Sequence, residues 1–112
     1  MAATAIKLLT LSVMAAVAVV ANRAITAAGA IPAAGARCAG FTDFPAAAGE
    51  RVSYAALGTT VAEAGAAIAV GAAVEVDVLG RVITKAAGVT VGHALKAAGA
   101  AGQKIEILLI PN

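Results

Sequence analysis

The sequence lacks tryptophan and is poor in the side chains that usually carry chemistry. It contains one cysteine and one histidine in 112 residues, and aromatic residues make up only 3% of the chain. Cys38 has no second cysteine with which to form a disulfide or a CxxC pair, so it is interpreted as a small buried thiol. His93 is expected to be structural or exposed. Because a zinc site needs three or four ligands, these two residues cannot supply a usual set. We therefore expect no metal, no cofactor and no enzymatic activity.

Charged residues are also scarce, at 12% of the chain with a net charge of +2. Lysine and arginine occur singly and form no run or stripe, which excludes the usual footprint of a nucleic-acid-binding protein. No uncharged apolar run approaches the ~20 residues that a transmembrane helix needs. Neither nucleic acid nor a membrane is therefore expected as a partner.

The few candidate polar sites have simpler structural interpretations. Asp43 and Glu50 are expected to cap turns, and Glu75 and Asp77 to face solvent on one strand. The segment 99–104 resembles a phosphate loop only superficially, because it lacks the Gly-Lys-Ser/Thr ending. The aromatic side chains are too few for base stacking and are expected to anchor the core: Phe41, Phe44 and Tyr54.

What the sequence does contain is glycine and a hydrophobic period of two. Twelve glycines and three prolines divide the chain into pieces mostly shorter than ten residues, too short for several packed helices. Only 64–70 and 96–101 could form brief helical turns. Alternating segments predict strands: 9–13, 52–54, 59–63, 74–78 with a two-residue Leu79-Gly80 turn into 81–84, and 104–109. The fold class predicted is all-β, a small compact β-barrel or sandwich of short strands.

Two stretches also repeat one pattern. In both 40–54 and 92–107, a strand enters a glycine, a loop of small residues follows, and a second glycine precedes the next strand. The pattern indicates one supersecondary unit used twice within a single domain. Two copies are too few for a solenoid.

The opening of the chain has two interpretations. Residues 8–21 have the length of a signal-peptide core, Lys7 precedes them, and 19–21 could serve as a cleavage site. That interpretation predicts a secreted or periplasmic small β-domain with an unknown partner. The alternation of apolar and polar residues over 9–13 instead favours a strand of the folded domain.

Alanine makes up about 30% of the chain and buries little area per residue. A core of alanine and valine stabilises a domain weakly, so we expect neighbouring subunits or a large partner to supply part of the stability.

A set of elements in fixed order resembles the small capsid cement, or decoration, proteins of tailed bacteriophages. The resemblance covers about Val13 to Pro111. It rests on these segments: 48–54, 57–59, 71–74, the turn 79–82, 91–95 and 105–109. It implies a structural protein on the outer surface of the mature capsid in the virion, which braces contacts between major capsid protein subunits, often as a homotrimer. The family offers no catalytic residues. Another virion component, such as a tail or head-fibre base, is a further possibility.

Given this resemblance, we expect residues 1–12 to form an N-terminal arm and 13–112 a single β-rich domain. An extended arm could add a strand to a sheet edge on the capsid. The alternative is that it completes the domain's own sheet. The residues expected to bind the capsid are Ile6, Lys7, Leu8, Leu9 and Leu11.

Overall fold

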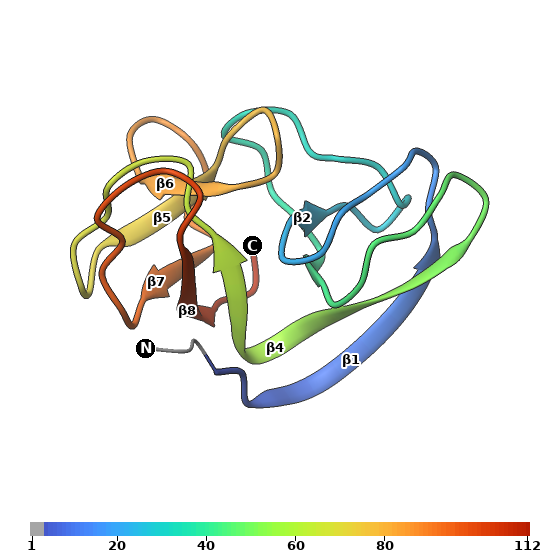
Figure 1. The fold of residues 1–112 in the computed structure, drawn as a ribbon, viewed down its shortest axis with the longest axis horizontal. Coiled ribbons are helices and arrows are strands. Elements are labelled where there is room, and N and C mark those ends of the chain that lie inside the picture. The colour runs from blue at the N-terminus through green and yellow to red at the C-terminus, as the bar shows by residue number, and fades with distance from the viewer. Residues whose placement is uncertain (1–3) are drawn as a thin grey trace.

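The computed structural model describes residues 4–112, and these residues form eight strands and no helix (Figure 1). No described segment is therefore a helix that could cross a membrane. The strands belong to one strongly curled antiparallel sheet, a half-barrel, which confirms the predicted all-β fold. The strands are β1 (Lys7–Met14), β2 (Ala24–Ile25), β3 (Gly40–Thr42), β4 (Arg51–Glu63), β5 (Ala73–Val76), β6 (Val82–Thr84), β7 (Gly92–Ala94) and β8 (Lys104–Leu109).

Strand β4 organises the sheet. Its first part pairs with β1 on one side and β3 on the other, and its last part pairs with β8. The two short strands predicted at 52–54 and 59–63 are therefore one long strand. Gly58 allows this because its φ is +94°, a left-handed conformation that bends the strand without ending it. The remaining order along the sheet is β8, β7, β5 and β6.

The opening segment pairs with the domain. Strand β1 runs antiparallel to β4, from the Lys7–Gly58 pair to the Met14–Arg51 pair. Residues 7–12 thus complete the domain's own sheet, the alternative to a free arm, because β4 offers them an unpaired edge. Residues 1–3 of the expected arm lie outside the described residues. Beyond β1, Ala15 and Val19 are core residues, so 8–21 contribute to the folded domain.

Two other local predictions are wrong. The β5–β6 hairpin turns through three residues: the Asp77 amide bonds to the Arg81 carbonyl, and Gly80 takes a φ of +79°. A glycine in this conformation is typical of three-residue hairpin loops. The segments that could have formed helical turns, 64–70 and 96–101, contain bends and turns but no helix, and they pair with each other through an Ile68–Ala98 bridge.

The repeated pattern extends over almost the whole chain. Residues 10–56, here called the N-repeat, and residues 59–109, the C-repeat, share strand pairings, loop bridges and capping bonds. The Val19–Ala46 bridge corresponds to Ile68–Ala98. Equivalent strand pairs in the N-repeat and the C-repeat are Ala24–Phe41 and Ala73–His93, Phe41–Ala55 and His93–Leu108, and Val13–Val52 and Ala62–Ile105.

The core forms two clusters. The smaller one belongs to the N-repeat and is built from Ala15, Val19, Ile25, Val52 and Tyr54. The larger one contains the interior of the C-repeat together with four N-repeat residues: Ala24, Cys38, Phe41 and Ala55. The N-repeat therefore covers the core of the C-repeat, and these four N-repeat residues are buried within that core.

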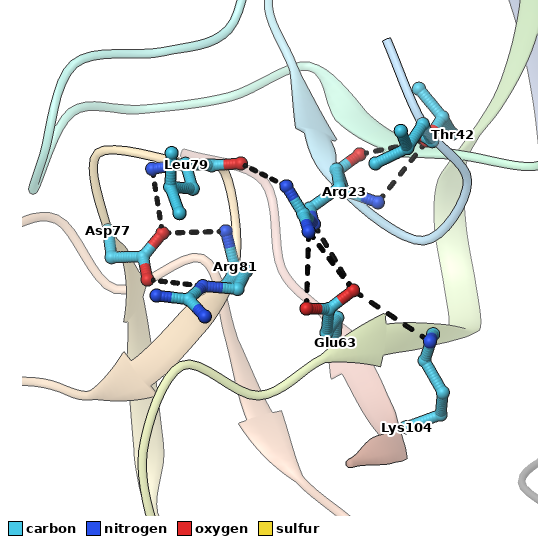
Figure 2. A network of polar contacts seen from close by, with 8 residues as sticks. Arg23, Thr42, Glu63, Asp77, Leu79, Arg81 and Lys104 are labelled. Atoms are coloured by element: carbon cyan, nitrogen blue, oxygen red, sulfur yellow. Dashed lines mark hydrogen bonds and ion pairs between the residues drawn. The ribbon is translucent and has the colours of Figure 1, made fainter. Parts of the chain in front are cut away.

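Polar contacts hold this junction together (Figure 2). The Arg23 guanidinium donates to both carboxylate oxygens of Glu63 at 3.2 Å, and it also donates to the Leu79 carbonyl at 3.2 Å. Lys104 lies 3.8 Å from the same Glu63 carboxylate. At the neighbouring position, the Asn22 side-chain amide donates to the Val61 carbonyl, and the backbone carbonyl of Asn22 accepts from the Glu63 amide. The turn 22–23 thus covers the outer edge of the last part of β4.

Candidate functional site

The most unusual surface of the molecule lies on β1 and the residue before it. Seven of the eight β1 residues are exposed, and the eighth is half-buried. Its side chains include large apolar ones that an ordinary surface strand would replace with polar residues. The exposed fractions are 68% for Ile6, 77% for Leu8, 41% for Leu9, 43% for Leu11 and 55% for Met14.

Polar contacts fix the backbone of this segment while its apolar side chains stay exposed. The Ile6 amide donates to the Thr59 hydroxyl at 2.7 Å, and the Thr59 amide donates to the Ile6 carbonyl at 2.8 Å. The Thr59 hydroxyl in turn donates to Glu106 at 2.7 Å. Lys7 forms an ion pair with Asp43. Of the expected capsid-binding residues, Lys7 is therefore already paired within the chain, and Ile6 and Leu8 protrude furthest.

The chemistry-bearing side chains do not converge. Among the described residues, no group of three or more His, Cys, Asp or Glu side chains could hold a metal ion. Burial raises the pKa of the Cys38 thiol to about 12, against a smaller lowering effect of the Gly40 amide. Such a thiol is protonated and unreactive at neutral pH. His93 is exposed on β7.

The acidic residues have structural partners. Glu50 accepts from the Ala47 amide at 2.8 Å, as expected of a residue that caps a turn. Asp43 instead connects strands, because it accepts from the Ser53 hydroxyl on β4 at 2.8 Å and forms an ion pair with Lys7 on β1. Asp77 accepts from the amides of its own hairpin.

The prediction that Glu75 faces solvent is wrong. It is only 7% exposed, because its carboxylate accepts hydrogen bonds from the amides of Ala86 at 2.5 Å and Gly88 at 3.0 Å. Phe44 also departs from expectation. It is 61% exposed, whereas Phe41 and Tyr54 are core residues.

Comparison with known proteins identifies the family of this all-β chain. The family model described as "Phage cement protein" matches residues 4–109. The chain belongs to the phage cement protein family. The resemblance noted from the sequence is thereby confirmed, and the match includes β1. The family is one of phage structural proteins, which makes this member a capsid-associated structural protein.

A solved structure shares the fold of this cement protein. It is the head fiber gp8.5 N base of bacteriophage phi29, with a TM-score of 0.77 and 18% sequence identity. The similarity covers 91% of this chain and 93% of the head-fibre chain. At this identity the similarity establishes the fold alone. No curated protein matches the sequence.

Proposed function

We propose that this cement protein binds the outer surface of the mature phage head and stabilises contacts between major capsid protein subunits. The observation that carries the proposal is the exposed apolar surface of Ile6 and β1 in a chain that belongs to the cement family. Such a surface is typical of a protein that is buried in an assembly. In this role the chain acts as a homotrimer, is not an enzyme, and needs no metal or cofactor.

The capsid-binding element is the segment Ile6–Leu11. Its backbone is already fixed against Thr59 and β4, so binding does not pay the full ordering entropy of a free arm, about 1–2 kcal/mol per residue. Ile6 and Leu8 are the side chains best placed to enter apolar pockets of the capsid. In a trimer, three such contacts would act together and raise the avidity by a factor of about 10²–10⁴.

The test uses a double variant, Ile6→Ser with Leu8→Ser, and undecorated expanded heads. Both side chains are exposed, so the variant keeps the wild-type fold and oligomeric state, while the number of copies bound per head falls sharply. Val78→Ser is the matched control, because Val78 is 70% exposed at the tip of the β5–β6 hairpin. Undiminished binding of the double variant would refute the assignment of this element.

A head-fibre base is the second candidate, favoured by the phi29 neighbour of the same fold. The number of copies per particle separates the two functions. A cement protein approaches the number of capsid subunits, whereas a fibre base occupies fewer sites.

A further inference from the structure

The two repeats of the chain are buried unequally, although their backbones pair in the same way. In the N-repeat, Ala24, Phe41 and Ala55 are buried, at 1%, 0% and 0% exposure, because they cover the core of the C-repeat. Their counterparts in the C-repeat form a face with nothing against it in the single chain: Ala73 is half-buried, His93 is exposed and Leu108 is 42% exposed. We call these three counterparts the C-face.

The surface that the other repeat covers differs in the opposite sense: it is buried in the C-repeat and uncovered in the N-repeat. In the C-repeat, Thr60, Ala62, Val91 and Ala98 are buried, at 2%, 0%, 0% and 3% exposure. The equivalent residues of the N-repeat are uncovered, since Leu11 is 43% exposed and the others are only half-buried. We call this uncovered set the N-face: Leu11, Val13, Ala39 and Ala46.

The polar edge shows the same imbalance. The turn 22–23 covers the β4 edge at Val61 and Glu63. The residues equivalent to that edge are Ser12 and Met14 on β1, which are exposed. The Ala15 amide bonds to the Glu50 carbonyl, and the alternation of an antiparallel ladder then turns the backbone groups of Ser12 away from β4. The turn equivalent to 22–23 is Gly71–Ala72.

Each chain therefore carries a C-face and an N-face that are complementary to one another and lie on different parts of the molecule. In Figure 1, β1 runs from the middle of the molecule toward one end of the long axis, and the turn that precedes β5 lies at the other end. One chain cannot bring these two faces together, but two chains can. Contact of this head-to-tail kind repeats from copy to copy and closes into a ring when the rotation permits.

We propose that a second copy of this chain occupies the N-face, and that it does so with its C-face and its Gly71–Ala72 turn. Leu11 then contacts the second copy, and Ile6 and Leu8 are left to bind the capsid. The contact between two copies then has the same form as the contact between the N-repeat and the C-repeat within one chain. Three copies joined in this way form a ring of six similar repeats in which every repeat is covered. The inference rests on the proposed function only for the number three; the contact surface follows from the internal repeat.

The first test introduces a charge into the C-face. Leu108→Glu is expected to weaken self-association roughly tenfold or more, measured by sedimentation equilibrium from micromolar to hundreds of micromolar protein. Leu108 is partly exposed in the single chain, so far-UV circular dichroism and the melting temperature should stay close to wild type. Val78→Glu, at the hairpin tip, is the matched control and should leave the mass unchanged. Wild-type self-association in the Leu108→Glu variant would overturn the proposal.

The second test rebuilds the internal ion pair between copies. Ala72 is the counterpart of Arg23, and Met14 is the counterpart of Glu63. Arg51, the β4 partner of Met14, corresponds to Lys104 beside Glu63. The double variant Ala72→Arg with Met14→Glu should therefore associate roughly two- to fivefold more tightly than either single variant. The gain should disappear in about 1 M salt. Equal association constants for the double and single variants would contradict the proposed register.

Head binding distinguishes this inference from the proposed function. A ring that forms in solution but does not bind expanded heads supports the contact and removes the capsid role. A chain that stays monomeric at hundreds of micromolar, and whose Leu108→Glu variant decorates heads as fully as wild type, removes the contact and leaves the capsid role intact.

Discussion

Glu75 shows how the fold changes the role of a single residue. By sequence it is the polar member of an alternating strand, and such residues usually face water. In the structure its carboxylate accepts from the amides of Ala86 and Gly88 and stabilises the loop that follows β6. These two hydrogen bonds, with a smaller contribution from the charge of Lys85, hold the pKa of Glu75 below its ordinary value of 4.5, and burial opposes them.

This predicts a specific pH dependence of stability. A carboxylate whose pKa is lowered by folding stabilises the folded state above its unfolded pKa, and that stabilisation is lost as the pH falls through the folded pKa. Glu75→Gln, which cannot ionise, should therefore melt below wild type at about pH 6. The difference in melting temperature between wild type and Glu75→Gln should decrease steadily toward about pH 3, as measured by thermal denaturation at a series of pH values. A gap that does not change with pH would show that the charge of Glu75 contributes nothing.

At the scale of the element, β4 is the strand that connects the two repeats, because it pairs with β1, β3 and β8. Its bend at Gly58 joins the two repeats, and the bend also brings Ile6 against Thr59. A Cβ atom at Gly58 would lie 2.3 Å from the Ile6 carbonyl oxygen, a contact that the chain cannot accommodate without moving β1. The glycine is thus required twice, for the left-handed backbone and for the close approach of the segment that we propose binds the capsid.

Gly58→Ala is expected to destabilise the protein more than Gly49→Ala. Gly49 also has a positive φ, +87°, but a Cβ there would meet nothing within 4 Å. In the Gly49→Ala variant the free energy of unfolding should fall only by the cost of placing alanine in a left-handed conformation, about 1–2 kcal/mol. In the Gly58→Ala variant the free energy of unfolding should fall further, and the amides of β1 should exchange their hydrogens faster. Equal losses in the two variants, from urea denaturation, would mean that the close approach of Ile6 is unimportant.

At the scale of the whole molecule, the two repeats share the larger core cluster, so they should unfold together. Phe41 lies in the N-repeat yet is fully buried in the cluster that contains the C-repeat interior. Its counterpart His93 is exposed on β7. The two equivalent positions therefore make opposite contributions to the stability of a single chain.

Phe41→Ala should lower the free energy of unfolding by about 3–5 kcal/mol and keep a single transition. His93→Ala should change it by no more than about 0.5 kcal/mol under conditions in which the chain is monomeric. Urea unfolding followed by circular dichroism and by Tyr54 fluorescence tests both. Two separate transitions in either protein would show that the repeats are independent units.

The sequence by itself determined the all-β class and the position of five of the eight strands; the short strands β2, β3 and β7 were not among the predicted segments. Alternation over 9–13, 74–76 and 104–109 indicated an extended backbone, and this pattern is local, so it can be read without a structure. The pattern did not determine burial, because β1 has no buried residue and Glu75 is buried. The glycines at 49 and 102 marked the ends of equivalent loops, which is why part of the repeat was visible. The family resemblance was carried by the same local elements in order.

Tertiary structure decided what no local pattern encodes. Whether 7–12 would form an arm or a strand depended on the free edge of β4, which is distant in sequence. Gly58 could have ended a strand or bent one, and pairing with both β1 and β8 made it a bend. Phe41 and Phe44 are three residues apart, yet only Phe41 meets the other repeat. Burial is set by what packs against a residue, so equivalent residues differ when only one of them has a neighbour.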